Sequence, residues 1–144
     1  MLKFLLAIDG SAPSLRAIET VARLARGELP LKVTLLNVRD TSALPQDLAD
    51  AELATLHAAQ QHDQDHVLNE AQSRALGCGL HVTGCVAGVG APASEIVRTA
   101  SARKADQIVL GAHGKHALAG GSLLPGSVAQ HVLCLATQPV LLVP

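Results

Sequence analysis

Short apolar runs alternate with stretches of helical periodicity along the whole chain, and this alternation restricts the possible folds more than any other feature. Strands that alternate with helices form right-handed βαβ units. We therefore predict an α/β fold with an open, doubly wound, mostly parallel sheet of five strands and helices on both faces. The expected strands are Leu2–Ile8, Lys32–Val38, Leu80–Val86, Gln107–Leu110 and Val140–Val143. The expected helices run from Ser11 or Ser14 to about Arg26, from Gln46 to about Leu76, from Ala91 to about Lys104, and from Ser127 to Leu135.

The 144 residues suit one domain, and no repeat or linker divides 1–144. Apolar residues make up 49 %, but with one Phe and no Tyr or Trp the core must consist of Leu, Val, Ile and Ala. A net charge of −1 gives no field that would attract nucleic acid or an anionic membrane. Without aromatic residues for base stacking, we expect neither nucleic acid nor membrane as a partner.

The cysteines and the N-terminus both predict a cytoplasmic protein. Cys78, Cys85 and Cys134 form no CxxC pair, so we expect small buried hydrophobes in a reducing compartment. The apolar run Phe4–Ile8 is short for a signal peptide and ends at the charged Asp9. No apolar run approaches the ~18 residues of a membrane span.

The residues that could bind a ligand follow two of the expected strands. In an open α/β sheet, ligands bind beyond the carboxyl ends of the strands, where the strand order reverses. The first expected strand ends in Asp9, and the fourth leads into a glycine-rich segment, Gly111–Ser127. If these strands are neighbours, the carboxylate and the glycine backbone share one crevice of nucleotide size. The carboxylate would then meet ribose hydroxyls or a metal.

The glycine-rich segment is suited to phosphate binding. Gly111, Gly114 and Gly126 lack side chains, so their N–H groups can approach an anion closely. Ser127 and Val128 begin a helix, whose positive dipole end favours negative charge. Lys115, His113 and His116 lie between these anchors and could reach a terminal phosphate. The alternative is that the glycines only make turns and Ser127 only caps the helix.

Other motifs argue against several kinds of chemistry. The segment does not read GxxxxGK[ST], and no GxGxxG follows the first strand, so machinery for fast NTP hydrolysis is not evident. His62 and His66 share a helical face at i, i+4, but a solvated face explains them better than a metal site does. Ser11 and Ser14 are expected to be helix caps.

The chain resembles the universal stress protein family, in its single-domain bacterial type. The similar segments are FLLAIDGS (4–11), LLNVRD (35–40), GSVAQHVL (126–133) and PVLLV (139–143), which cover essentially the whole chain in order. The resemblance implies the sheet order 3-2-1-4-5, with strands one and four adjacent. It also implies a homodimer through the last strand, Val140–Val143.

Nucleotide-binding members of that family carry G-x2-G-x9-G-[ST] after the fourth strand. This chain has Gly111, two residues and Gly114, but eleven residues before Gly126-Ser127, so its loop is two residues longer. The same resemblance implies that Ala7, Asp9, Val38 and Leu110 contact base or ribose.

These observations favour a stress-response regulator that is dimeric and binds ATP or AMP, with Mg²⁺ reaching Asp9 through the nucleotide. The expected nucleotide-binding residues are Ala7, Asp9, Val38, Leu110, Gly111, Gly114, Lys115, Gly126, Ser127 and Val128. Two alternatives stay open: a dimeric scaffold that binds no nucleotide, which the longer loop favours, and a weak ATPase or phosphate donor. No catalytic residue is assigned.

Overall fold

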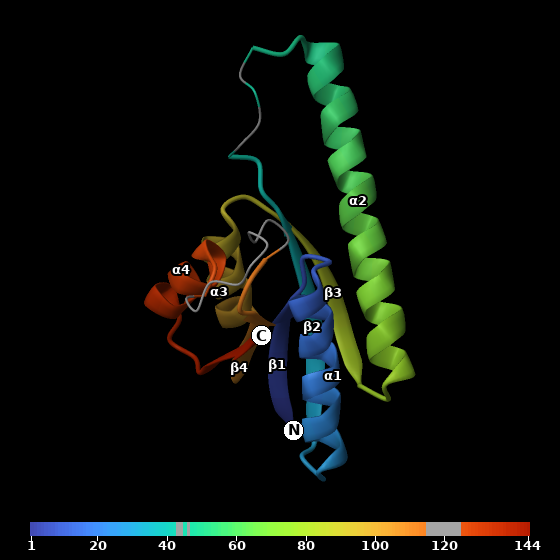
Figure 1. The fold of residues 1–144 in the computed structure, drawn as a ribbon, viewed down its shortest axis with the longest axis vertical. Helices are drawn as coiled ribbons and strands as arrows, with labels where there is room; N and C mark the ends of the chain where they lie inside the picture. Colours follow the sequence, from blue (N-terminus) through green and yellow to red (C-terminus); the bar gives the residue numbers. More distant parts are fainter. Residues whose placement is uncertain (43–44, 46, 115–124) are drawn as a thin grey trace.

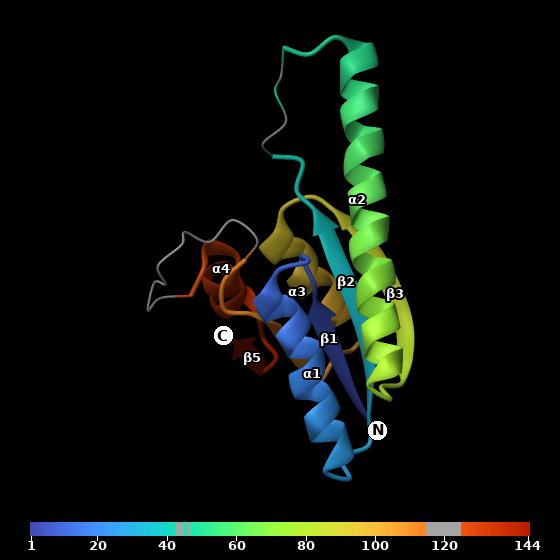
Figure 2. The ribbon, with the colours of Figure 1, turned by 45° about the vertical axis from the view of Figure 1, so that its right-hand side comes forward.

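A computed structural model describes residues 1–42, 45, 47–114 and 125–144. It contains one five-stranded, all-parallel sheet in the order β3-β2-β1-β4-β5 (Figures 1 and 2). The predicted fold and strand order are thereby confirmed. The strands are β1 (Leu2–Ala7), β2 (Leu31–Arg39), β3 (Val82–Val89), β4 (Gln107–Gly111) and β5 (Val140–Val143). The helices are α1 (Ala12–Arg26), α2 (Asp50–Gly77), α3 (Pro92–Ala102) and α4 (Ser127–Leu135).

Two apolar cores lie on opposite faces of the sheet. Helices α1 and α2 bury Ile18, Val21 and Leu68 against one face, which includes Leu6 and Leu35 of the central strands. Helices α3 and α4 cover the other face (Figure 2), with a core built from Leu5, Leu36, Ala93, Ile96, Ala100, Ile108, Ala129 and Val132. Because β1 and β2 are buried on both faces, their nearly continuous apolar runs are required.

Several element boundaries differ from the prediction. Helix α2 begins at Asp50 rather than near Gln46, where acidic residues in the first turn, Asp50 and Glu52, suit the helix dipole. Strand β3 begins at Val82 and continues to Val89, because it pairs with β2 as far as Arg39. Helix α3 ends at Ala102, two residues before the expected Lys104.

The α1 cap is assigned to one of the two candidate serines. Ser11 is the N-cap, and its hydroxyl accepts a hydrogen bond from the Ser14 N–H at 3.3 Å. Ser14 is instead buried in the first turn, where its hydroxyl donates to the Ser11 carbonyl at 3.0 Å. These bonds fix the start of α1 directly after the end of β1.

The prediction that all three cysteines are buried is wrong. Cys85 and Cys134 are exposed and Cys78 is half-buried. Cys85 lies on β3, an edge strand whose burial alternates, and Cys134 lies on the solvent face of α4. Edge position and helix phase therefore outweigh the general tendency of free cysteine to be buried.

Helix α2 is much longer than the sheet that it covers. Its buried residues are Gln64, Leu68, Ala71 and Ala75, all in its second half. The first half extends past the carboxyl ends of the strands (Figure 1). No helix in the described part of the chain is long and apolar enough to cross a membrane.

Candidate functional site: a cavity at the carboxyl ends of the strands

A cavity of about 800 Å³ opens at the carboxyl ends of β1, β2 and β4, between α2 and α4. This volume lies within the usual range for small-molecule and cofactor sites. It occupies the place where the strand order reverses, since β1 has β2 on one side and β4 on the other. Nine residues of the predicted site line it: Ala7, Asp9, Val38, Leu110, Gly111, Gly114, Gly126, Ser127 and Val128. Lys115, like His116, lies outside the described residues.

The end of β1 aims the Asp9 carboxylate into this cavity. Strand pairing stops at Ala7, which lies opposite Leu110 of β4, and Gly10 then takes a positive φ of 85°. Asp9 Oδ1 accepts a hydrogen bond from the Ser11 N–H at 2.9 Å, an Asx turn that leads into the α1 cap. The position of Asp9 is therefore set by the β1–α1 turn.

Gly111 and Gly114 let β4 and its following loop approach that turn. A Cβ on residue 111 would lie 2.8 Å from Pro13 Cβ and 3.1 Å from the Ser14 backbone nitrogen. A Cβ on residue 114 would lie 3.1 Å from Asp9 Oδ2. Gly111 therefore permits the packing of β4 against α1, whereas Gly114 keeps bare backbone next to the carboxylate.

The other anchor of the glycine segment is held at the start of α4. The Gly126 N–H donates to the Ala112 carbonyl at 2.7 Å, and the Ala112 N–H donates to the Val143 carbonyl at 2.8 Å. Gly126 is also the N-cap of α4 and has no side chain that could bond to the first-turn N–H groups. These N–H groups and the positive end of the helix dipole therefore border the cavity, an arrangement that favours an anion.

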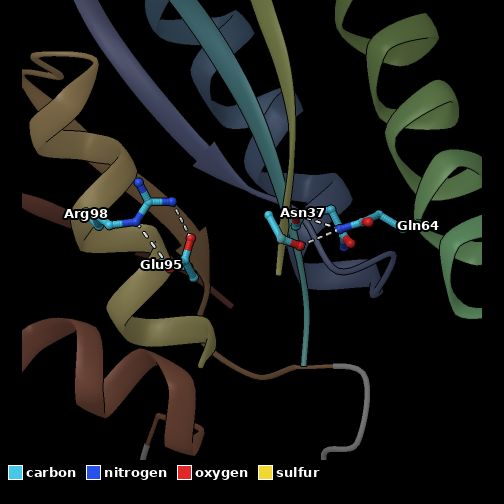
Figure 3. A network of polar contacts seen from close by, with 5 residues as sticks. Asn37, Gln64, Glu95 and Arg98 are labelled. Atoms are coloured by element: carbon cyan, nitrogen blue, oxygen red, sulfur yellow. Dashed lines mark hydrogen bonds and ion pairs between the residues drawn. The ribbon is translucent and has the colours of Figure 1, made fainter. Parts of the chain in front are cut away.

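A buried amide network, which sequence reasoning missed, joins α2 to the three strand ends. Gln64 Nε2 donates to the carbonyls of Asn37 and Gly88, at 3.0 and 2.8 Å. Asn37 Nδ2 donates to the Ile8 carbonyl at 2.6 Å. Figure 3 shows Gln64 reaching from α2 to Asn37, with the surface pair Glu95–Arg98 separate on α3. The sequence signal for this network was that Gln64 shares the helical spacing of the buried apolar residues Leu68, Ala71 and Ala75.

A polar wall beyond Val38 was also missed. Arg39 Nη1 donates to the His57 carbonyl at 3.2 Å, while Arg39 Nε and Gln60 Oε1 are buried without a hydrogen-bond partner in the described part of the chain. Both side chains line the cavity. Buried polar atoms normally have partners, so these two are suited to a polar ligand atom.

Asp40 stands at the same wall. The Ser42 hydroxyl, at 2.6 Å, and then the Ser42 N–H, at 2.9 Å, donate to its carboxylate and lower the pKa of Asp40. These hydrogen bonds therefore favour the charged form of Asp40, which adds negative charge to the lining of the cavity.

The described histidines differ in their surroundings. His113 lines the cavity beside Gly114, whereas His62 and His66 are exposed on α2. Within the described ranges, no group of three or more His, Cys, Asp or Glu could hold a metal ion.

The comparisons with known proteins identify the family. The sequence pattern of the Universal stress protein family matches residues 1–144. Universal stress protein MJ0531 of Methanocaldococcus jannaschii is 32 % identical over 142 residues, which are 98 % of this chain and 81 % of that protein. The chain therefore belongs to the universal stress protein family.

Solved structures show the same fold. The hypothetical protein MJ0577, whose structure was used to assign its biochemical function, superposes with a TM-score of 0.81 and 27 % identity. That match covers 98 % of this chain and 94 % of the other. A universal stress protein in complex with cAMP superposes with a TM-score of 0.65 and 27 % identity, over 99 % and 95 % of the two chains.

Proposed function

We propose that this universal stress protein binds an adenine nucleotide, ATP or AMP, in the cavity between α2 and α4. The observation that carries the proposal is that Asp9, Gly114 and Gly126, from three separate parts of the sequence, line one cavity at the carboxyl ends of the strands. A universal stress protein of similar fold is solved in complex with cAMP, which supports an adenine nucleotide as the ligand proposed here. Residues 1–144 would act as one nucleotide-binding domain.

The phosphates belong on the α4 side. The N–H groups at Gly114 and at the first turn of α4, from Ser127 and Val128, are suited to phosphate oxygens. The helix dipole adds attraction for the negative charge. In this proposal Lys115, in the intervening loop, and His113 contact the terminal phosphate. The loop's two extra residues would be accommodated between the anchors, which the Gly126–Ala112 hydrogen bond holds together.

The nucleoside belongs on the β1–β2 side. Ala7, Val38 and Leu110 give the cavity apolar surface for the base. Asp9 would accept hydrogen bonds from the ribose hydroxyls. A single carboxylate beside a phosphate site also fits Mg²⁺, which proteins commonly hold through one or two carboxylates, ligand phosphates and water. Asp9 is the residue that would hold this ion, and the ion would neutralise phosphate charge.

We propose further that the chain acts as a homodimer. Strand β5 is an edge strand that pairs with β4 alone, so one side of Val140–Val143 lacks a strand partner within the described chain. The neighbouring helix α4 exposes Leu133 and Leu135 by 48 % and 50 %. Exposed leucines next to an edge strand are suited to contact with a second copy. The dimer would serve as a regulator in stress response, in the cytoplasm, where its three free thiols would stay reduced.

Mass spectrometry of ligand released from the purified protein tests the proposal. The protein is denatured with acid, and the supernatant is compared with that of a Gly114→Val variant prepared in parallel. We expect an adenine nucleotide at a near-stoichiometric amount from the native sequence and little from the variant. Protein that carries no nucleotide and acquires none when incubated with ATP or AMP would favour the scaffold alternative.

A further inference from the structure

Three cationic side chains lie near the amino ends of the strands, at the opposite end of the sheet from the proposed nucleotide cavity. They are Lys3 at the start of β1, Lys32 at the start of β2, and Arg103 at the C-cap of α3. All three line a pocket of about 180 Å³, and none of the described residues that line it is acidic. Lys3 and Asp9 are six positions apart, so this pocket lies about 20 Å from the Asp9 end of the same strand.

The sheet register places the two lysines side by side. Lys3 pairs directly with Lys32, at the usual strand spacing of about 4.8 Å. Their side chains share the sheet face of Leu5 and Thr34, which follow two positions later on each strand. Like charges placed opposite each other on neighbouring strands repel. The register therefore places two like charges on neighbouring strands, and an anion bound between them would relieve their repulsion.

Gly84 admits the third charge. A Cβ on residue 84 would lie 3.1 Å from Arg103 Nη1, so the guanidinium lies against bare backbone of β3. In the described part of the chain, the ion pairs are Arg74–Glu19 and Arg98–Glu95, and neither involves these three cations. Asp106 is the acidic residue nearest to Arg103 in the sequence. Its Oδ2 accepts a hydrogen bond from the Lys3 backbone N–H at 2.8 Å.

Two hydroxyl groups complete the pocket. The register of β2 and β3 shifts between Val33 and Thr34, and this irregularity directs Thr83 toward the pocket. Thr83 Oγ1 donates to the Val33 carbonyl at 3.1 Å. Thr34, a residue that is only 8 % exposed, also lines the pocket, and its Oγ1 is 3.5 Å from Thr83 Oγ1, a weak contact that an anion could replace.

We infer that this pocket is a second anion site, for a phosphate-type dianion. Three cations from three elements, a hydroxyl donor and no carboxylate in the lining match the needs of a tetrahedral oxyanion with two charges. The volume accepts inorganic phosphate or the phosphate group of a small monoester, but not a nucleotide. The site depends on none of the residues assigned to nucleotide binding, so it stands independently of that proposal.

Backbone amide NMR of the whole protein locates the site. Inorganic phosphate is titrated at constant ionic strength, with chloride as the balancing ion. We expect saturable shifts at the amides of Thr34, Thr83 and Gly84, separate from any shifts at Gly126 and Ser127. Shifts confined to Gly126 and Ser127, or a response that never saturates, would overturn the second site.

Charge-removal variants give a matched comparison. Arg103→Gln should weaken phosphate binding at Thr34 and Thr83 about tenfold, as expected for the loss of a charge-assisted bond. Lys104→Gln removes an equal charge next to Arg103 but outside the pocket lining, and should change the affinity by less than about twofold. Equal weakening by both variants would indicate a general charge effect and overturn the site.

The stability of Lys32→Gln provides a readout that a merely structural lysine would not give. In chloride the variant should melt at the wild-type temperature or above it, because a repulsion is relieved. In phosphate it should melt below the wild type, because the bound anion stabilises only the intact pocket. If the substitution lowers the melting temperature equally in both salts, the inference is contradicted.

Parallel titration with glycerol phosphate identifies the source of the anion. Tighter binding of glycerol phosphate than of inorganic phosphate indicates an organic monoester, and equal or weaker binding indicates the free ion.

Discussion

Asp9 and Gly114 lie next to each other in the lining of the cavity, where a Cβ on residue 114 would come within 3.1 Å of Asp9 Oδ2. Asp9 follows β1 and Gly114 follows β4, and they are brought together because these two strands are neighbours. The contact places a carboxylate next to bare backbone amides at one point. In the proposed nucleotide complex, that point would lie between the ribose and the phosphates, so any side chain at 114 would affect both halves of the site.

Gly111→Ala should destabilise the fold. The new Cβ would lie 2.8 Å from Pro13 Cβ and 3.1 Å from the Ser14 nitrogen, which belong to the first turn of α1. We expect a loss of about 1–3 kcal/mol in the free energy of unfolding, the usual cost of overpacking. Urea denaturation measures it, and Gly77→Ala, where a Cβ meets nothing within 4 Å, is the control. Identical urea midpoints for the wild type and Gly111→Ala would show that β4 and α1 are packed less tightly than these distances indicate.

Gln64→Ala should cost about 1–3 kcal/mol of unfolding free energy, because the carbonyls of Asn37 and Gly88 lose their amide donor inside the protein. Gln61→Ala, an exposed change on the same helix, should stay within about 0.5 kcal/mol of wild type. Thermal and urea unfolding compare the two variants. If they are equally stable, the amide network does not hold α2 to the sheet.

The carboxyl of Asp40 should titrate below the ordinary Asp pKa of about 3.9. Hydrogen bonds from the Ser42 hydroxyl and N–H stabilise its charged form, so Ser42→Ala should raise the pKa of Asp40 toward the ordinary value. The folded-state pKa is lowered, so the stabilisation is present above the unfolded-state pKa and is lost as pH falls through the folded-state value. Carboxyl carbon NMR across pH 2–6 provides the measurement. A pKa unchanged by the Ser42 substitution would contradict the turn.

The dimer proposal predicts that substitution beside β5 changes the oligomeric state. Leu133→Lys should place a charge in the apolar interface and shift the protein from dimer to monomer. Leu76→Lys, which alters a Leu of similar exposure at the far end of α2, should leave the dimer intact. Sedimentation velocity distinguishes these states. A wild-type monomer at micromolar concentration would exclude the dimer proposal.

The architecture could be predicted from the sequence because the strands and helices differ in period and the strands are almost all apolar. Asp9, Gly111 and Gly126 were identifiable because they follow strands or begin a helix, the positions where α/β folds bind ligands. The polar wall of Arg39 and Gln60 and the amide network of Gln64 could not be identified from the sequence. Their positions depend on how α2 lies across the sheet, a tertiary relationship that leaves no regular pattern in a mostly polar helix.

The cationic pocket escaped prediction for a different reason. Lys3 and Lys32 become neighbours only through the β1–β2 register, and Arg103 joins them only because Gly84 leaves room. None of these residues forms a motif in the chain. Likewise, the exposure of Cys85 depends on the place of β3 at the edge of the sheet, which the family resemblance implied but no pattern in the residues gave.

Isothermal titration calorimetry of ATP and AMP into the wild type, Gly114→Val and Gly77→Ala tests the central proposal most directly. The wild type and Gly77→Ala should bind one nucleotide per chain with the same affinity. Gly114→Val should bind at least about tenfold more weakly, a loss of about 1.4 kcal/mol or more, while its circular dichroism spectrum stays unchanged. If the wild type binds neither nucleotide, or if Gly114→Val binds as tightly as the wild type, then the meeting of Asp9 and Gly114 is not a nucleotide site.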